Sequence, residues 1–380
     1  MSNLGDSYIN NLKNILDNGY TCNPRGSEIK ELLGSVIEGK ADENQIISYP
    51  GIRDVSDFNT NPGKYLESEL LWYFSGSNSP EFISLFGSMW DRIKSADNTL
   101  NSNYGRSVFY DSIPEFNVPK FDWVINAFKK DKDTRQAIIP YTNEKIYLEE
   151  FGKDFTCTQL QHFFIRENKL HSIVYIRSSD SILGLNFDIP FWSIVCQLMR
   201  EYLVGNYYVN NKLGEVICDN LGIGNLKVFI GSSHIYSNHY SLCRKLCEFD
   251  KRSFKSIKVK TGVAFSSLKD NKEINDVICY DYCPEILKWA GKNVDDSTIR
   301  IISASKHVKD GEKDYLYRKE SIFNSSRIIM RIFRNAYNYA LDEFFVDSGV
   351  RVMTDDKIRE LKEIMTKYVN IWFNYYFEIV

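Results

Sequence analysis

The chain has 380 residues, a formal net charge of −3 at pH 7, and 43% hydrophobic and 14% aromatic residues. This length predicts one large domain with an extension, or two domains, and the apolar content is ample for a buried core. The slight negative charge argues against direct nucleic-acid binding, because duplex-binding surfaces are normally basic. The sequence has no apolar run long enough to span a bilayer and no signal-peptide pattern, so we expect a cytoplasmic protein with no membrane partner.

Eight cysteines are scattered along the chain, and without a secretory signal we expect them to be reduced thiols. Two pairs have C-x-x-x-C spacing, Cys243 with Cys247 and Cys279 with Cys283. Neither pair has the tight spacing of structural zinc sites, and the first pair lies one turn apart on a predicted helix. We therefore favour free thiols over a metal site.

The first predicted helix leads into a polar loop. Apolar side chains at helical spacing predict a helix over residues 7–18, with Gly19 as its stop. The loop that follows, residues 22–26, carries one basic side chain, Arg25. Taken alone, Arg25 is most simply a solvated turn residue.

A second helix is predicted over residues 64–75, ended by Gly76. Glu67 and Glu69 both lie among its leucines and aromatic residues. A glutamate on an apolar helix face costs free energy unless it is paired or functional. We place Glu67 on the solvated face, which leaves Glu69 as the residue that needs an explanation.

The centre of the sequence predicts a β-hairpin that ends in a polar cluster. Apolar and polar residues alternate over 160–166 and 169–177, with a short turn between them. Cys157 precedes the first strand, and the run Arg177–Asp180 ends the second. Packing of a core hairpin does not require such a polar run. The run is suited instead to binding an anion and a polar ring. A lone cysteine at a strand start is more often a small core residue than a nucleophile.

The remaining elements are helices and one buried strand. Residues 189–204 have the spacing of an amphipathic helix, and residues 227–232 the composition of a buried strand that runs into a polar segment. Near the end of the chain, residues 328–340 and 356–373 carry two further helical stripes. We interpret these stripes as core or docking faces.

The order of these motifs resembles the thymidylate synthase family, which includes the pyrimidine-nucleotide hydroxymethylases. RSSDSILGLNFD, residues 177–188, is similar to the family signature RSxDxxLGxPFN, and SHIYSNH, residues 233–239, to THLYSNH. Shorter matches occur in the expected order at residues 68–76, 89–91, 104–105 and 133–136. The resemblance covers roughly residues 7–250. It implies an α/β (α+β) catalytic domain, residues 1–290, with a large mixed sheet flanked by helices and a helical C-terminal extension, residues 291–380.

The resemblance also implies a role for each matching residue. The catalytic residues would be the nucleophile Cys157, with Arg177 stabilising its thiolate, the acid/base Glu69, and Tyr104 and Asp188. A pyrimidine nucleoside monophosphate would be held through its phosphate by Arg25, Arg177, Ser178 and Arg135 of the other chain of a homodimer, and through its sugar by His234 and Tyr236. The co-substrate methylenetetrahydrofolate would be held by Trp90, Asp180, Leu183, Gly184 and Phe187.

Asp188 stands where thymidylate synthases have Asn, and this difference bears on the base. An Asn amide satisfies both the N3 donor and the O4 acceptor of uracil, whereas an Asp accepts from the amino group of cytosine and can share a proton with N3. Facing uracil, an Asp would set acceptor against acceptor, at a cost on the order of 1–3 kcal/mol. The residue also suits an N-cap of the following helix.

The residues and the resemblance together predict hydroxymethylation of dCMP at ring carbon 5, a reaction that would suit nucleotide biosynthesis for a virus that modifies its DNA. One alternative is thymidylate synthase-type methylation of dUMP or dCMP. A second, favoured by further departures from the family pattern, is a nucleotide-binding homologue without catalysis. Those departures are Gln136 for Arg, Thr158 for His, Asn186 for Pro and a C-terminal segment with no counterpart in the family. Gly26, next to Arg25, also stands where the family has Thr.

Overall fold

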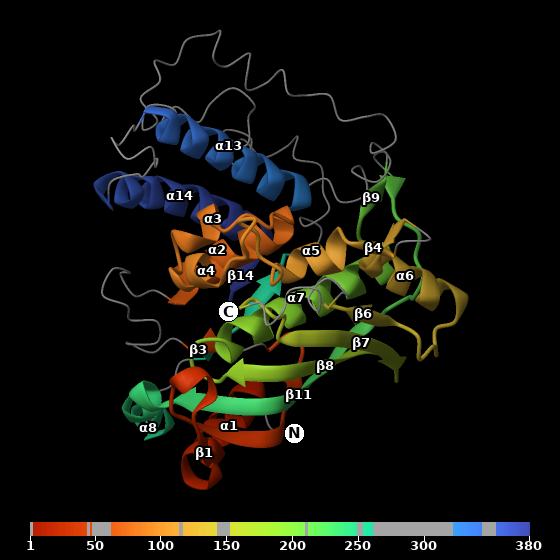
Figure 1. The fold of residues 1–380 in the computed structure, drawn as a ribbon. Helices are drawn as coiled ribbons and strands as arrows, with labels where there is room; N and C mark the ends of the chain where they lie inside the picture. The colour runs from red at the N-terminus through yellow and green to blue at the C-terminus, as the bar shows by residue number, and fades with distance from the viewer. Residues whose placement is uncertain are drawn as a thin grey trace.

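A six-stranded mixed sheet lies at the centre of the computed structural model (Figure 1). The structure describes residues 3–43, 46–47, 62–113, 117–142, 153–209, 212–248, 254–260, 322–343 and 355–380. The strand order is β1-β2-β11-β8-β7-β6, and β11 runs parallel to β8 while every other pair in this sheet is antiparallel. The strands are β1 Tyr20–Cys22, β2 Ile29–Lys40, β6 Ile138–Pro140, β7 Thr158–Arg166, β8 Lys169–Asp180 and β11 Gly222–Tyr236.

Four short strand pairs lie outside this sheet. They are β3 Ile46–Ile47 with β12 Phe254–Lys255, β4 Ser112–Ile113 with β5 Val118–Pro119, β9 Tyr208–Val209 with β10 Lys212–Leu213, and β13 Ile257–Val259 with β14 Phe377–Ile379. The described helices are α1 Leu4–Asn18, α2 Pro62–Ser75, α3 Glu81–Ser84, α4 Met89–Ile93, α5 Tyr104–Phe109, α6 Lys120–Lys130, α7 Leu185–Leu203, α8 Tyr240–Glu248, α13 Ile322–Glu343 and α14 Asp355–Tyr376. None of the helices in the described ranges is both long and apolar enough to cross a bilayer.

The predicted hairpin is formed by β7 and β8. Its turn residues Glu167 and Asn168 have φ values of 49° and 55°, the paired positive values that match the right-handed twist of two antiparallel strands. The second strand extends to Asp180, so the polar run begun by Arg177 is the end of a strand in the middle of the sheet. The hairpin therefore brings these polar side chains to the end of the strands, next to the start of α7.

The sheet has one covered face and one open face. Ile37, Val228 and Val174 form a cross-strand row on β2, β11 and β8, and all three are fully buried. The next row consists of Val36, Phe229 and Tyr175, which are 44%, 37% and 41% exposed. Because successive side chains of a strand point to opposite faces, the first row marks the core and the second an uncovered apolar surface.

Helix α7 begins earlier than the sequence predicts. Its N-cap is Gly184, and the backbone N–H of Asp188 donates to the carbonyl of Gly184 at 3.1 Å. The expectation that Asp188 is an N-cap is therefore wrong, because Asp188 lies inside the first turn of the helix, four residues after the N-cap Gly184. Asp188 instead presents a half-buried carboxylate from within that turn.

The two C-terminal stripes are the helices α13 and α14, which pack beside α2 (Figure 1). The ring of Phe74 on α2 lies 5.4 Å from that of Phe323, 6.0 Å from Trp372 and 6.1 Å from Phe377. Strand β14 then pairs with β13, next to α7. These helices thus share one hydrophobic core with the helix that carries Glu69.

Replacing Trp372 with alanine should lower the free energy of unfolding by about 3–5 kcal/mol, because it removes a fully buried indole from this core. Denaturant unfolding followed by circular dichroism measures the loss. The control is Ile371→Ala one position away, where the side chain is 37% exposed and the loss should stay below about 1 kcal/mol. Equal losses for the two variants would contradict the packing described here.

Candidate active site

The loop before β7 is held against the end of β8 by Arg177. Its guanidinium donates to the carbonyls of Phe155 at 2.5 Å and Thr156 at 3.2 Å, and its Nη2 lies 3.4 Å from Sγ of Cys157. The ring of Phe155 lies under the same guanidinium, with Cζ 5.0 Å from the ring centroid. One arginine thus fixes the loop and faces the thiol.

The pKa of the Cys157 thiol is raised by its surroundings. Burial raises its pKa above the ordinary value, and the charges of Asp188 and Asp154 raise it further. Arg177 and Arg25 act in the opposite direction. Arg177 thus favours the thiolate, as the resemblance implies, but the desolvation of the buried sulfur outweighs it and the pKa of Cys157 is raised on balance.

This balance predicts how fast the thiol is alkylated as pH changes. Because only the thiolate reacts, the iodoacetamide rate at Cys157 should keep rising above pH 9, and Arg177→Gln should slow it at every pH below that. The positive charge of Arg177 stabilises the thiolate. Its removal therefore raises the pKa of Cys157 and lowers the fraction of the thiol that is ionised and reactive. Mass spectrometry of the alkylated peptide measures the rate, and Arg166→Gln, a surface change on the same hairpin, is the control. An Arg177→Gln rate equal to the wild-type rate would contradict this electrostatic account.

Asp188 lies among three buried tyrosines and the thiol. Burial raises the pKa of Tyr73, Tyr104 and Tyr141, and the charge of Asp188 adds to the rise in each case. Hydroxyl groups with raised pKa values stay protonated and act as hydrogen-bond donors at neutral pH. Sequence reasoning did not identify Tyr73 or Tyr141. The available signal for Tyr73 is a hydroxyl at a position where the family motif has Phe.

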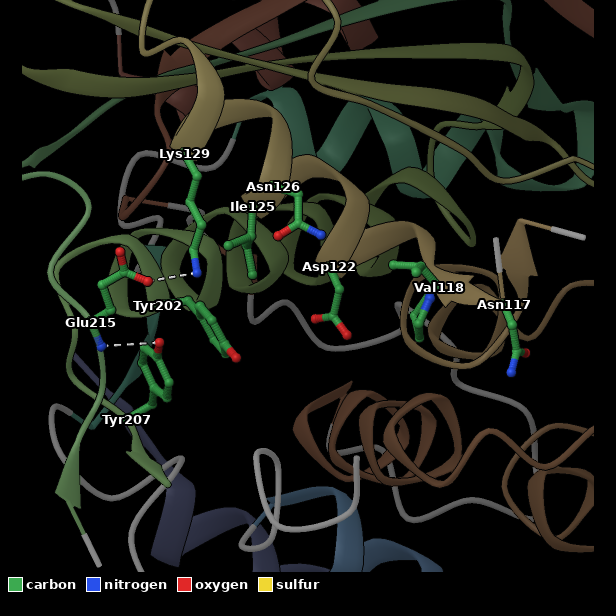
Figure 2. Close-up of a pocket in the computed structure, with 10 residues that line it drawn as sticks. Asn117, Val118, Asp122, Ile125, Asn126, Lys129, Tyr202, Tyr207 and Glu215 are labelled. Atoms are coloured by element: carbon green, nitrogen blue, oxygen red, sulfur yellow. Dashed lines mark hydrogen bonds and ion pairs between the residues drawn. The ribbon is translucent and has the colours of Figure 1, made fainter. Parts of the chain in front are cut away.

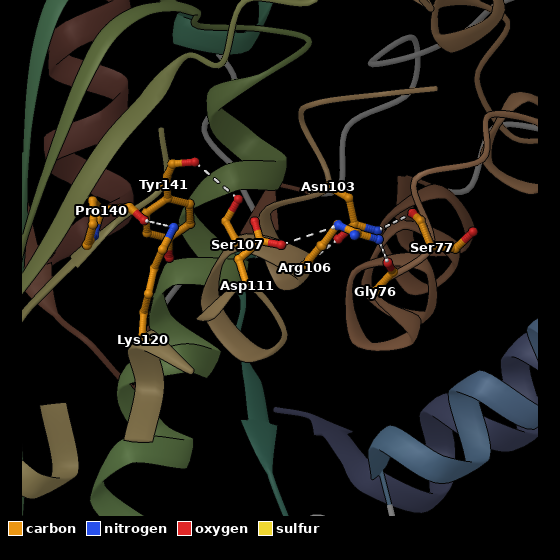
Figure 3. Close-up of polar contacts among 9 residues, drawn as sticks. All are labelled: Gly76, Ser77, Asn103, Arg106, Ser107, Asp111, Lys120, Pro140 and Tyr141. Carbon is orange, nitrogen blue, oxygen red and sulfur yellow. Dashed lines mark hydrogen bonds and ion pairs between the residues drawn. The ribbon is translucent and has the colours of Figure 1, made fainter. Parts of the chain in front are cut away.

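Polar contacts fix α5, and with it Tyr104, between α2 and β6 (Figure 3). The amide of Asn103 donates to the carbonyls of Trp72 at 2.9 Å and Ser77 at 2.7 Å, while its oxygen caps the helix at the N–H of Arg106, 2.8 Å away. A Cβ on Gly105 would lie 2.0 Å from the carbonyl oxygen of Tyr73, so only glycine allows this close crossing. The Tyr104-Gly105 pair is therefore a packing motif as well as a site motif.

Glu69 is buried on α2 and is linked to two of the predicted folate-pocket residues. Its Oε1 accepts a hydrogen bond from the hydroxyl of Tyr65 at 2.8 Å, and that hydroxyl accepts from Nε1 of Trp90 at 2.9 Å. The ring of Phe187 packs edge-on against Tyr65 at 5.1 Å. Tyr65 thus joins the predicted acid/base to the predicted pterin wall, although sequence reasoning did not identify it.

The turn between β8 and α7 contains the other predicted folate residues. Oδ1 of Asp180 accepts from the backbone N–H groups of Ile182 at 2.8 Å and Leu183 at 3.0 Å. This carboxylate oxygen therefore shapes the turn that presents Leu183 and Gly184. Ser178 lies two residues before Asp180 and is half-buried.

Arg25 interacts electrostatically with both Cys157 and Tyr236. Burial raises the pKa of Tyr236, and the charges of Asp180, Arg25 and Cys157 also act on it. Arg25 is exposed and has a φ of 54°, an uncommon conformation for a residue with a side chain. The ring of His234 lies 5.4 Å from that of Tyr236, and within the described residues its buried Nδ1 has no hydrogen-bond partner.

The structure does not bring Arg135 to this cluster. It is exposed, and its carbonyl lies 3.0 Å from Nε2 of His162 on β7. His162 is five residues beyond Cys157 along an extended strand, or roughly 16 Å. Arg135 therefore does not join the phosphate residues of its own chain.

Other features of the described chain lie apart from this cluster. A surface cavity of about 320 Å³ lies between α6 and the end of α7, and none of the predicted site residues lines it (Figure 2). The six cysteines in the described ranges are free thiols, and no metal-binding group of three or more side chains occurs there. Cys279 and Cys283 lie outside the described residues.

Comparison with known proteins identifies the class. A family model described as thymidylate synthase matches residues 6–288. The chain therefore belongs to the thymidylate synthase family, which confirms the resemblance and the fold class, and makes it a one-carbon transferase that uses methylenetetrahydrofolate. Among individual proteins it is similar to the deoxycytidylate 5-hydroxymethyltransferases of Enterobacteria phages T4 and T2. Each is 27% identical over 184 residues, which cover 47% of this chain and 69% of the relative.

Proposed function

We propose that this chain transfers a hydroxymethyl group to ring carbon 5 of dCMP, with methylenetetrahydrofolate as co-substrate. The observation that carries the proposal is the place of Asp188. It stands in the first turn of α7, beside Tyr104 and Cys157, at the position where thymidylate synthases have Asn. The similarity to phage deoxycytidylate 5-hydroxymethyltransferases supports the same base.

Cys157 would begin the reaction by bonding its Sγ to ring carbon 6. The thiol proton must pass to water as this bond forms, because burial keeps the free thiol protonated. Arg177, with Nη2 3.4 Å from Sγ, would stabilise the charge that develops on sulfur. The addition removes the aromatic character of the ring and makes carbon 5 nucleophilic. Arg177, Arg25 and Ser178 would meanwhile hold the phosphate through charge-assisted hydrogen bonds.

When bound, methylenetetrahydrofolate would supply the one-carbon unit. The side chains that would hold it fit a flat heterocycle: Trp90 and Phe187 meet at the Tyr65 ring, and Leu183 and Gly184 present a small apolar turn. Once ring carbon 5 has bonded to the one-carbon unit, Glu69, on the same wall, would accept the proton of ring carbon 5 through water, and a proton would return to the nitrogen from which the one-carbon unit is released. As the hydroxyl of water bonds to the methylene carbon on ring carbon 5, Glu69 would accept its proton, the carbon 5–carbon 6 double bond would re-form, and the Cys157 thiolate would leave.

We further propose a homodimer built through the open face of the sheet. Val36, Phe229 and Tyr175 form an exposed apolar row there, and the rings of Tyr175 and Phe229 stack at 5.3 Å. Such a continuous apolar surface is typical of a subunit interface. A dimer would also give Arg135 a phosphate to bind, since it lies apart from the site of its own chain. Light scattering after size exclusion tests the state, and a monomeric mass at all micromolar concentrations would contradict it.

The experiment that tests the function is release of tritium from nucleotides labelled at ring carbon 5, with methylenetetrahydrofolate present. We would compare dCMP, CMP and dUMP, and identify the products by mass. Release from dCMP with a hydroxymethyl product is the expected result. Release with a methyl product, from dUMP or dCMP, would replace it with a thymidylate synthase-type reaction. No release from any of the three would favour a binding protein without catalysis.

A further inference from the structure

The hydroxyl of Tyr65 is the meeting point of three helices. Tyr65 on α2 donates to Glu69 on the same helix, accepts from Trp90 on α4, and packs against Phe187 on α7. All four side chains are buried, with Tyr65 only 5% exposed. The contact between Tyr65 and Glu69 follows from their spacing of four residues, which places both on one helix face.

The ring of Tyr65 has little freedom to move. Phe187 packs edge-on against it at 5.1 Å, and a Cβ on Gly87 would lie 2.9 Å from Cε2 of the ring. The backbone at Gly87 therefore closes in on the ring where any larger residue would clash. A tyrosine confined in this way holds its hydroxyl oxygen at a fixed point relative to Glu69.

The direction of this hydrogen-bond chain is fixed by chemistry. An indole N–H can only donate, so the Tyr65 oxygen is the acceptor from Trp90. A phenol has one proton, and here that proton is directed to Oε1 of Glu69. Oε1 is thus an acceptor, and any proton that Glu69 carries must reside on its other oxygen, Oε2.

We infer that Tyr65 is a positioning residue that occupies Oε1 of Glu69, so that the carboxyl exchanges protons with water through Oε2. The inference rests on the acid/base role given to Glu69 in the proposed function. It adds a residue outside the family motifs that sets both the orientation and the proton affinity of that group. It also couples the carboxyl to Trp90, so that a co-substrate packing on Trp90 acts on the same hydrogen-bond chain.

The test is Tyr65→Phe, which removes the hydroxyl and keeps the ring. Loss of a donor to the carboxylate favours its protonated form, so the acid limb of the kcat–pH profile should move to higher pH by about one unit. At neutral pH, kcat should fall about ten-fold with KM for the nucleotide within two-fold. Tyr110→Phe is the matched control, because the Tyr110 hydroxyl donates to the carbonyl of Phe74, away from Glu69. It should leave the profile unchanged.

Two further measurements separate positioning from a general structural effect. In a Glu69→Gln background, Tyr65→Phe should cause no further loss of kcat, because the two groups act as one unit. Independently of turnover, ¹³C NMR titration of labelled glutamate carboxyls, with the Glu69→Gln variant used for assignment, should show the Glu69 signal titrating at higher pH in Tyr65→Phe. An unchanged titration or an unmoved acid limb would overturn the inference. If the wild-type chain releases no tritium from any nucleotide, the proposed function fails, and the NMR titration still decides the role of Tyr65.

Discussion

Replacing Cys157 with alanine should abolish tritium release from dCMP and leave dCMP binding nearly intact. In the proposed mechanism the sulfur forms the bond that makes ring carbon 5 reactive, and alanine has no group that can form it, so turnover should fall at least about 10⁴-fold. In the proposed function, nucleotide affinity depends instead on phosphate and sugar contacts, for which Arg177, Arg25 and His234 are the proposed residues. Tritium release measures the first effect and isothermal titration calorimetry with dCMP the second.

The control for this change is Cys196→Ala. Cys196 is a fully buried thiol on α7 whose S–H faces the carbonyl of Leu170, so its removal deletes a sulfur without touching the site. That variant should keep most of its turnover. Substantial turnover by Cys157→Ala would remove the thiol from the mechanism, and loss of dCMP binding would make Cys157 part of the phosphate site instead.

Short-range patterns account for the elements that position the site. The β7–β8 hairpin follows from period-two alternation on either side of a short polar turn, and α2 and α7 follow from apolar residues three and four apart. The order of the strands does not follow from such patterns. Strand β11 lies between β2 and β8, and its partners are separated from it by many residues, so only the family resemblance predicts a large mixed sheet.

The predicted site residues come mostly together, and the features that the sequence does not reveal depend on burial and long-range contact. The raised pKa of Cys157 reflects desolvation, which no local motif encodes. The sequence reveals only that Tyr65 lies one helical turn before Glu69, which is enough to predict contact between these two side chains. Its contacts with Trp90 and Phe187 join helices that are distant along the chain.

Replacing Asp188 with asparagine should shift the preference from dCMP toward dUMP. The carboxylate can only accept hydrogen bonds when ionised, whereas the amide offers the donor and acceptor that uracil requires. Each buried mismatch costs about 1–3 kcal/mol, so the ratio of kcat/KM for dCMP to that for dUMP should fall by roughly two orders of magnitude. Tritium release from each nucleotide, measured for both proteins under subsaturating conditions, gives this ratio.

The change at Asp188 also removes a charge that raises the pKa of Cys157, so its effect on the thiol must be separated from its effect on the base. Asp154→Asn does this, because Asp154 raises the same thiol pKa while its carboxylate is bonded to the backbone N–H groups of Asn101 at 2.6 Å and Ser102 at 3.0 Å. Both variants should lower the pKa of Cys157, and this effect on the thiol should change the rates for dCMP and dUMP by the same factor. Only Asp188→Asn should change the ratio between them. A ratio that stays the same in Asp188→Asn would mean that the base is read by another residue.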